Sequence, residues 1–185
     1  MAAHPFDLPP SPWVREWAAW IQPGGAVLDV ACGAGRHARL LASLGFEVDA
    51  VDRDAALFVG PPAGVALLQA DIESGPWPYA GRRFAGIVVT NYLHRPLLPV
   101  LVDSLEPQGL LIYETFARGN ERYGKPRNPD FLLRPGELLA AVAGDLAVVA
   151  YEHGTLTRPG PAVVQRIAAV RGDVTAVIDS APIVL

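Results

Sequence analysis

Residues 27–38 read VLDVACGAGRHA, and this stretch decides the fold. An apolar run leads into two glycines, Gly33 and Gly35, and a segment with helical periodicity follows them. We therefore expect a buried strand over residues 26–31, a tight turn, and a helix over residues 35–44 that ends at Gly45. Glycines at such a turn let the backbone approach a ligand, which the first N–H groups of the helix then face. The same pattern also occurs at strand-to-helix turns that bind nothing.

The rest of the chain alternates between strand and helix patterns. Further strands are predicted at residues 47–52, 65–69, 84–90, 110–115, 147–152 and 163–170. Helices are predicted at residues 97–105 and 135–142. This alternation predicts an α/β fold: a Rossmann-like three-layer sandwich with a seven-stranded, mostly parallel sheet. Because no helix separates the last two strands, we expect an antiparallel edge strand.

A further helix precedes the first strand. Ser11 suits its N-cap, and the three tryptophans Trp13, Trp17 and Trp20 would share one of its faces. We expect residues 1–24 to form an N-terminal helical cap on a single domain that comprises the whole chain, residues 1–185.

Composition excludes several classes of protein. Hydrophobic residues make up 51% of the 185, which is typical of a folded domain. The net charge of −4 and the lack of a basic stripe argue against a nucleic-acid partner. Cys32 is the only cysteine, so we expect neither a disulfide nor a cysteine-based metal site, and we predict no metal. With no secretory signal and no long apolar run, we expect a cytoplasmic protein without a membrane partner. The oligomeric state is not indicated.

Three acidic residues fall at successive strand ends beside the glycine turn. Asp29 lies in the first predicted strand, Asp52 ends the second and Asp71 follows the third. Each of them could cap a turn, which is common for Asp at a strand end. Residues 33–38 also fit the Gly-x-Gly-x-x-Gly/Ala fingerprint of dinucleotide binding. However, a carboxylate at Asp29 would repel a pyrophosphate and favour a ligand that carries positive charge.

The run from Asp29 to Gly35, together with Asp52 and Asp71, resembles the class I S-adenosylmethionine-dependent methyltransferases. Residues 32–54, CGAGRHARLLASLGFEVDAVDRD, are similar to the small bacterial branch around the tellurite-resistance methyltransferase. The resemblance covers about residues 27–114 and is specific for the cofactor, not for the methyl acceptor. It departs from the family between Asp71 and Phe84, where the sequence SGPWP stands in place of the usual helix.

The resemblance implies S-adenosylmethionine as the cofactor and a role for each matching residue. Asp29 would lie near its ammonium, Asp52 would hold the ribose, and Asn91 would face the methyl group. Two glycines would line the methionine end, Arg53 would flank the adenine, and Asp71 with the backbone of Ile72 would bind the adenine edge. The full cofactor-binding set is Asp29, Ala31, Gly33, Gly35, Arg36, Asp52, Arg53, Asp71, Ile72 and Asn91.

Methyl transfer requires no particular catalytic residue, because the cofactor supplies the reactivity and the protein aligns the reactants. We therefore assign no catalytic residue and look for acceptor-binding side chains at the carboxyl edge of the sheet. Tyr113 and Glu114 alternate across the fifth strand, so only one of them faces the acceptor, and we favour Glu114. His94 and His153 also follow strands; His94 could equally be a surface residue at a helix start, and for His153 we prefer an ordinary turn residue. The candidate substrate residues are Tyr92, His94, Glu114, Arg118, Tyr123 and Arg127.

Residues 118–134 read RGNERYGKPRNPDFLLR and form a long polar insertion. Five basic residues concentrate there in an otherwise acidic chain, which favours a lid over a small, anionic acceptor. The alternative is a surface loop whose charges pair with Glu121 and Asp130.

Four functions fit these observations. The first is a methyltransferase acting on a small molecule. The second is a non-enzymatic module that binds S-adenosylmethionine. The third is an NAD-binding oxidoreductase, which Asp29 and Asp71 disfavour. The fourth is a methyltransferase for macromolecules, for which the chain has no Asn/Asp-Pro-Pro-Tyr motif.

Overall fold

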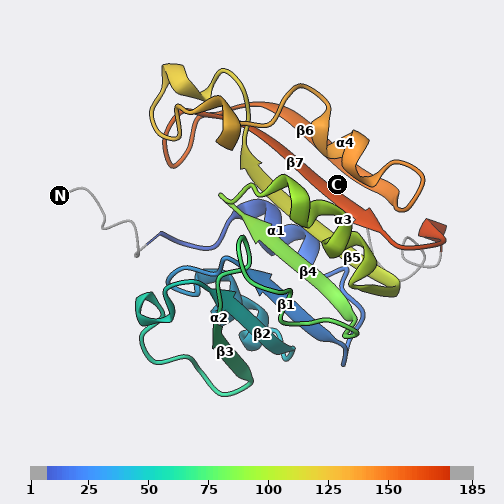
Figure 1. The fold of residues 1–185 in the computed structure, drawn as a ribbon. Helices are drawn as coiled ribbons and strands as arrows, with labels where there is room; N and C mark the ends of the chain where they lie inside the picture. Colours follow the sequence, from blue (N-terminus) through green and yellow to red (C-terminus); the bar gives the residue numbers. More distant parts are fainter. Residues whose placement is uncertain (1–7, 176–185) are drawn as a thin grey trace.

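The computed structural model describes residues 8–175, which form a seven-stranded sheet (Figure 1). The strand order is β3-β2-β1-β4-β5-β7-β6, and β7 is antiparallel to both of its neighbours, while the remaining pairs are parallel. The predicted mostly parallel sheet is thereby confirmed, with its antiparallel strand next to the outermost one. The strands are β1 (Ala26–Val30), β2 (Glu47–Asp52), β3 (Val65–Gln69), β4 (Phe84–Thr90), β5 (Leu105–Phe116), β6 (Ala147–Leu156) and β7 (Ala162–Val170).

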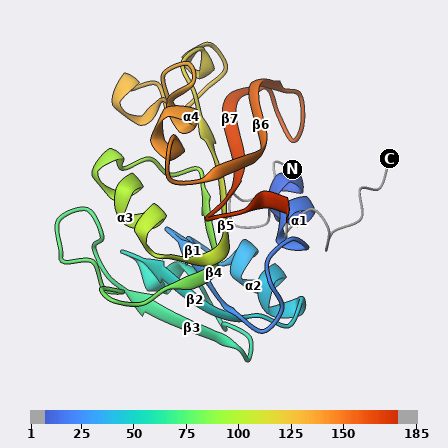
Figure 2. The ribbon, with the colours of Figure 1, turned by 90° about the vertical axis from the view of Figure 1, so that its right-hand side faces the viewer.

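Helices cover both faces of this sheet, as a three-layer sandwich requires. Figure 2 shows α1 and α2 on one face and α3 and α4 on the other. The helices are α1 (Pro12–Ala18), α2 (Arg36–Ser43), α3 (Leu98–Asp103) and α4 (Glu137–Val142). Four short 3-10 turns join them: η1 (Ala55–Leu57), η2 (Arg95–Leu97), η3 (Asn120–Arg122) and η4 (Pro129–Phe131). None of the helices within residues 8–175 is long and apolar enough to cross a bilayer.

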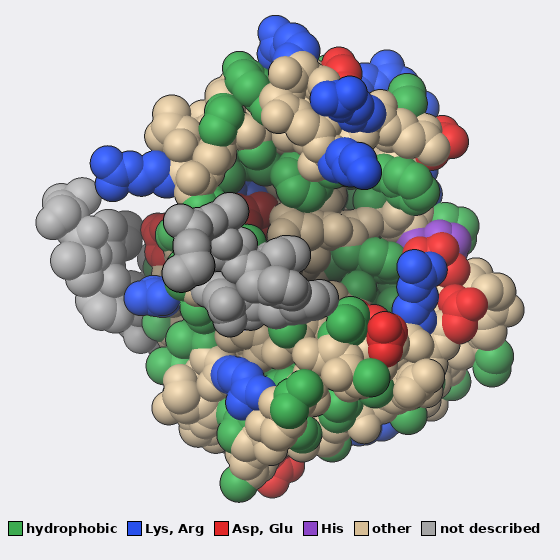
Figure 3. All heavy atoms as spheres, turned by 90° about the vertical axis from the view of Figure 1, so that its left-hand side faces the viewer, with side chains coloured by type: hydrophobic (Ala, Val, Ile, Leu, Met, Phe, Trp, Pro, Cys, Tyr) green, Lys and Arg blue, Asp and Glu red, His purple; other side chains and the backbone are tan. Residues whose placement is uncertain are grey.

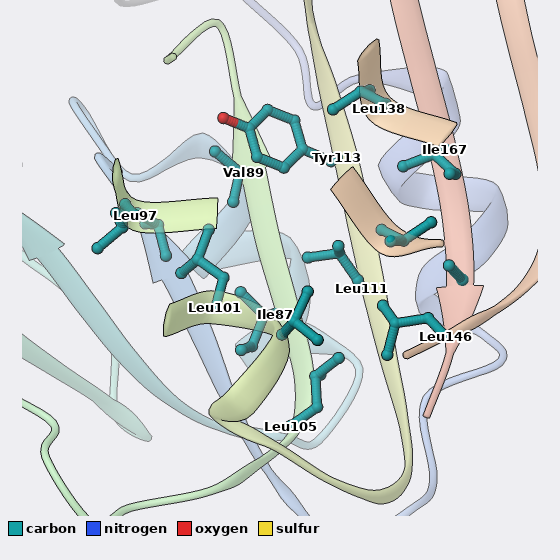
Figure 4. Close-up of a cluster of buried hydrophobic side chains, with 14 of the residues drawn as sticks. Ile87, Val89, Leu97, Leu101, Leu105, Leu111, Tyr113, Leu138, Leu146 and Ile167 are labelled. Carbon is teal, nitrogen blue, oxygen red and sulfur yellow. The ribbon is translucent and has the colours of Figure 1, made fainter. Parts of the chain in front are cut away.

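Each face of the sheet buries its own apolar cluster, because successive side chains of a strand point to opposite faces. On one face, Leu101 of α3 and Leu138 of α4 pack with Leu111 and Tyr113 of β5 (Figure 4). On the other face, the tryptophans of α1 pack against α2 and the neighbouring strands. Trp13 and Trp17 share a buried face of α1 as predicted, with ring centroids 5.5 Å apart, whereas Trp20 lies past the end of the helix at Ala18 and packs 5.1 Å from Trp17.

Several predicted boundaries were wrong where tertiary pairing sets the end of an element. The first strand ends at Val30, one residue early, and β5 begins at Leu105 instead of residue 110, because Leu105 pairs with Phe84 across a register shift. The helix expected over residues 135–142 begins only at Glu137, after Gly136 takes up a left-handed conformation. The sixth strand extends to Leu156 as one arm of a hairpin with β7.

Candidate functional site

A cavity of about 310 Å³ opens at the carboxyl ends of β1, β2 and β4. The strand order reverses at β1, which lies between β2 and β4, and such a switch point is where open α/β sheets bind ligands. Five of the ten predicted cofactor residues line this cavity, together with one predicted substrate residue, Tyr92. Two lining residues, Glu73 and Phe131, were not predicted. The lining consists of Ala31, Asp52, Arg53, Asp71, Ile72, Glu73, Tyr92 and Phe131.

The two glycines of the turn serve different purposes. Both have positive φ, 53° at Gly33 and 76° at Gly35, a region that favours glycine. A Cβ on Gly33 would meet no atom within 4 Å, so the space beside it is open. A Cβ on Gly35 would lie 2.2 Å from the ring of Phe58. Packing therefore explains Gly35, whereas the open space at Gly33 suits close approach by a ligand.

Ala31 also adopts a left-handed conformation, with φ of 53°, although it carries a Cβ. This conformation costs an L-residue roughly 1–2 kcal/mol. Ala31 lines the cavity directly after β1, where the chain turns toward Gly33. The strain is thus located at the wall of the cavity and is offset by the surrounding structure.

Asp52 joins the glycine turn to the end of β2. Its Oδ2 accepts a hydrogen bond from the N–H of Gly33 over 2.8 Å, and its Oδ1 accepts one from the N–H of Asp54 over 2.9 Å. Each carboxylate oxygen can accept a second bond, so Asp52 retains capacity for hydroxyl groups of a ligand. It combines a turn-stabilising role with a place in the cavity wall.

Asp29 is almost fully buried in β1, with 1% exposure, and its Oδ2 accepts a hydrogen bond from the N–H of Ala38 over 2.9 Å. This bond satisfies one of the free N–H groups in the first turn of α2. Burial raises the pKa of Asp29 to about 7, while the bond from Ala38 and the charge of Arg36 act in the opposite direction. Asp29 therefore stabilises the first turn of α2. Its contact with the ammonium of a ligand stays a prediction.

Asp71 is exposed at the cavity rim and organises the loop that follows β3. Its Oδ1 accepts hydrogen bonds from the N–H groups of Glu73 and Ser74, and its Oδ2 accepts one from the hydroxyl of Ser74. The bond from the Ser74 hydroxyl, with the two from backbone N–H groups, lowers the pKa of Asp71, so this carboxylate stays ionised. The loop contains no helix between Ala70 and Phe84, as the SGPWP sequence indicated.

Of the three predicted site residues that follow β4, one lines the cavity and two do not. Tyr92 lines the cavity, and its buried hydroxyl has no hydrogen-bond partner among residues 8–175. Burial, with the nearby charge of Glu73, raises the pKa of this phenol. Asn91 is exposed with φ of 55°, its N–H donates to the carbonyl of Glu114, and it is not among the residues that line the cavity. His94 is half-buried and precedes η2.

A buried polar network that the sequence did not predict lies on the α1 face, at the ends of β4 and β5. His37 of α2 is 2% exposed, and its Nε2 accepts a hydrogen bond from the N–H of Ser11 over 3.1 Å. The proton of the neutral ring is then on Nδ1, which donates to the hydroxyl of Thr90 over 3.2 Å. Burial lowers the pKa of His37 to about 3, so the ring stays neutral. This histidine is structural, because both ring nitrogens are engaged within the protein.

Glu114 belongs to the same network. Its Oε1 accepts a hydrogen bond from the hydroxyl of Ser11 over 2.8 Å, and its Oε2 pairs with Arg166 over 3.4 Å. Tyr113 points to the opposite face, where its hydroxyl donates to the carbonyl of Tyr92, so the predicted alternation is confirmed. Glu114 lies within β5, as predicted, and it is largely buried beneath α1. Arg36 is half-buried nearby, where its Nη1 donates to the carbonyl of Pro9.

His153 does not follow the sixth strand, as the sequence suggested. It lies inside β6, opposite Gln165 of β7, because the hairpin continues the strand to Leu156. It is exposed and does not line the cavity. Among residues 8–175, no group of His, Cys, Asp or Glu side chains is arranged to hold a metal ion.

The polar insertion at residues 118–134 is held by hydrogen bonds and buried side chains near its two ends, whereas most side chains in its middle are exposed. The side chain of Asn120 accepts from the N–H of Val163 and donates to the carbonyl of Pro126, and Leu132 and Leu133 are buried. Basic side chains gather over the end of the molecule that carries this loop (Figure 3). In the part of the chain that the structure describes, no ion pair neutralises Arg118, Arg122, Lys125 or Arg127.

The alternative, in which these charges pair with Glu121 and Asp130, is therefore not formed by these four side chains. Glu121 accepts a hydrogen bond from the N–H of Gly119 instead. Arg118, Tyr123 and Arg127, the loop's three predicted substrate residues, are all exposed and do not line the cavity.

Comparison with known proteins shows which fold this architecture belongs to. A family model described as tellurite resistance protein TehB matches residues 12–59. TehB from Haemophilus influenzae superposes with a TM-score of 0.70 at 19% identity, over 86% of this chain. The chain has the fold of class I S-adenosylmethionine-dependent methyltransferases. It spans 61% of the length of that TehB protein.

Two other solved structures with this methyltransferase fold support the assignment. The glycopeptide N-methyltransferase MtfA complexed with S-adenosyl-L-methionine has a TM-score of 0.60 at 21% identity, over 85% of this chain and 92% of its own. An S-adenosylmethionine-dependent methyltransferase from Mesorhizobium loti has a TM-score of 0.64 at 20% identity, over 85% of this chain and 98% of its own. A search of curated proteins finds no match to this chain.

Proposed function

We propose that this protein is an S-adenosylmethionine-dependent methyltransferase that acts on a small, anionic acceptor in the cytoplasm. One observation carries the cofactor part of the proposal. The cavity at the switch point of a methyltransferase fold is walled by Asp52 and Asp71, beside a glycine turn with open space at Gly33.

The residues of the cavity fit this cofactor chemically. Asp52 has free acceptor capacity for the two ribose hydroxyls. Asp71 and Ile72 offer a carboxylate and an apolar surface to an adenine ring. The unpartnered hydroxyl of Tyr92 is a further polar group in the wall. Two carboxylates also suit a ligand that carries ammonium and sulfonium charges better than they suit a pyrophosphate.

The chain's own contribution to the reaction is to bind, orient and exclude water. When bound, S-adenosylmethionine supplies an electrophilic methyl group, and displacement needs an acceptor atom held in line with it. Basic side chains gather over the end of the molecule that carries residues 118–134 (Figure 3), and four of them form no ion pair among the described residues, which favours an acceptor with negative charge. An acceptor that is already anionic needs no general base. Glu114, occupied by Ser11 and Arg166, is therefore not assigned that role.

Calorimetry and turnover test the proposal. We expect S-adenosylhomocysteine to bind with one site per chain, NAD to bind much more weakly, and S-adenosylmethionine to be consumed in the presence of small carboxylates or oxyanions. Arg127→Gln should raise the KM for such an acceptor without changing the affinity for S-adenosylhomocysteine. Tight binding of NAD without binding of S-adenosylhomocysteine would contradict the cofactor assignment. Turnover only with neutral acceptors, unaffected by Arg127→Gln, would contradict the acceptor class.

A further inference from the structure

Arg95 forms a four-bond clamp that no part of the proposed chemistry uses directly. It lies in η2, three residues after the cavity residue Tyr92. Its Nε and Nη2 donate to the two carboxylate oxygens of Glu137 over 2.6 and 3.1 Å. Its Nη1 donates to the carbonyl of Asp130, and its Nη2 also donates to the carbonyl of Leu132 over 3.0 Å. Only the planar guanidinium fork of arginine can satisfy all four acceptors at once.

The two carbonyls that Arg95 holds belong to the residues on either side of Phe131. Phe131 is 52% exposed, yet it lines the cavity together with Asp52, Arg53 and Asp71. Its neighbour Leu132 is buried, so the backbone is also held from the apolar side. The backbone on both sides of Phe131 is thereby held, so its ring starts from a fixed point at the cavity although little of the protein packs around it. An exposed aromatic ring that is held in place is available to a ligand.

The clamp keeps its charge throughout the ordinary pH range. Burial raises the pKa of Glu137, but hydrogen bonds from Arg95 and from the N–H of Arg134 outweigh this, and the pKa falls to about 2. Glu137 begins α4, so the same carboxylate joins the loop, α4 and η2. The part of the loop that contains Tyr123 and Arg127 lies outside the clamp.

We propose that Arg95 is a positioning residue for the cofactor: by clamping Asp130, Leu132 and Glu137 it holds Phe131 as an aromatic wall against the adenosine end of S-adenosylmethionine. This inference rests on the proposed function. In this arrangement the residues around Phe131 form a held wall of the cavity, whereas the part of the insertion with Tyr123 and Arg127 lies outside these bonds and faces the acceptor. In the competing interpretation, Arg95 only attaches α4 to η2, and Phe131 is an incidental surface residue.

A double-mutant cycle separates the two interpretations. Arg95→Lys keeps the charge but loses the fork, and Phe131→Ala removes the ring; both singles and the double variant are compared with wild type by calorimetry. We expect each single variant to weaken S-adenosylhomocysteine binding about three- to tenfold, the range that an aromatic contact represents. The double variant should be no weaker than the single variants, because Arg95 acts through Phe131. Adenosine alone should lose the same factor, and Phe131→Tyr should restore binding.

Arg83→Lys is the matched control. Arg83 also donates to two main-chain carbonyls, those of Asp103 and Leu105, but it lies at the opposite end of β4. This variant should leave the affinity unchanged. Equal effects of Arg83→Lys and Arg95→Lys, additive losses in the double variant, or full binding by Phe131→Ala would each overturn the inference. Because Phe131 is half exposed, its variants remain informative even where Arg95→Lys fails to fold. Failure of the wild type to bind S-adenosylhomocysteine would instead refute the proposed function itself.

Discussion

The carboxylate of Asp52 accepts a hydrogen bond from the backbone N–H of Gly33 over 2.8 Å. This bond links the end of β2 to the turn that follows β1, two segments that are adjacent only in the folded sheet. The side chain that shapes the turn also lines the cavity. Turn geometry and ligand binding therefore depend on one carboxylate.

Asp52→Ala should weaken S-adenosylhomocysteine binding by about 1.5–3 kcal/mol, or roughly 10- to 150-fold, because hydrogen bonds to a charged group are lost. Calorimetry measures this loss, and urea unfolding checks that the fold persists. Asp49→Ala is the control from the same strand: Asp49 pairs with Arg82 on the surface, away from the cavity. An affinity that is the same in the wild type and Asp52→Ala would reject the ribose-binding role.

The two glycines of the turn should respond differently to alanine. Gly33→Ala should lower the free energy of unfolding by only about 1–2 kcal/mol, for its positive φ, yet reduce S-adenosylhomocysteine affinity at least about tenfold. Gly35→Ala should cost about 2–5 kcal/mol in stability, because the added Cβ collides with Phe58 as well.

Adding Phe58→Leu should recover part of the stability lost in Gly35→Ala and none of the affinity lost in Gly33→Ala. Urea unfolding and calorimetry on the same preparations provide both readouts. If Gly33→Ala binds S-adenosylhomocysteine normally, the ligand does not approach the backbone at this turn.

Asp29 should make the protein less stable as the pH rises. Its pKa in the folded protein, about 7, lies above the ordinary value of 3.8, so the folded state holds the proton more tightly than the unfolded state does. Stability from this group is therefore complete below about pH 4 and is lost as the pH rises to about 7. Relative to Asp29→Asn, which does not titrate, the wild type should lose on the order of a few kcal/mol across that window.

Urea unfolding at a series of pH values measures this difference. Asp71→Asn is a useful contrast, because the pKa of Asp71 is lowered and its contribution is lost only as the pH falls through the acid range. A constant difference between wild type and Asp29→Asn from pH 4 to pH 8 would show that the Asp29 carboxylate is not destabilised by burial.

Local sequence patterns determined the order and type of the elements. Periodicity identified all seven strands, and Ser11 was correctly placed as the N-cap of α1, where its hydroxyl accepts from the N–H of Trp13. Because parallel strands bring their carboxyl ends to one edge, the sequence also placed Asp52 and Asp71 together, and both line the cavity, whereas Asp29 of the same predicted set is buried under α2. These predictions depend on backbone geometry alone, which a short stretch of sequence specifies.

Only the tertiary structure decided which side chains meet across long separations. Ser11 and Glu114 lie 103 positions apart, and a hydrogen bond joins them. Glu114, which the sequence predicted to bind the methyl acceptor, therefore belongs to a buried network with His37. Phe131 lines the cavity from the insertion after β5, and Arg95 of η2 donates to the carbonyls on either side of it. Periodicity assigns a side chain to a face of an element, but its partners depend on how the elements pack, and that packing minimises the free energy of the whole chain.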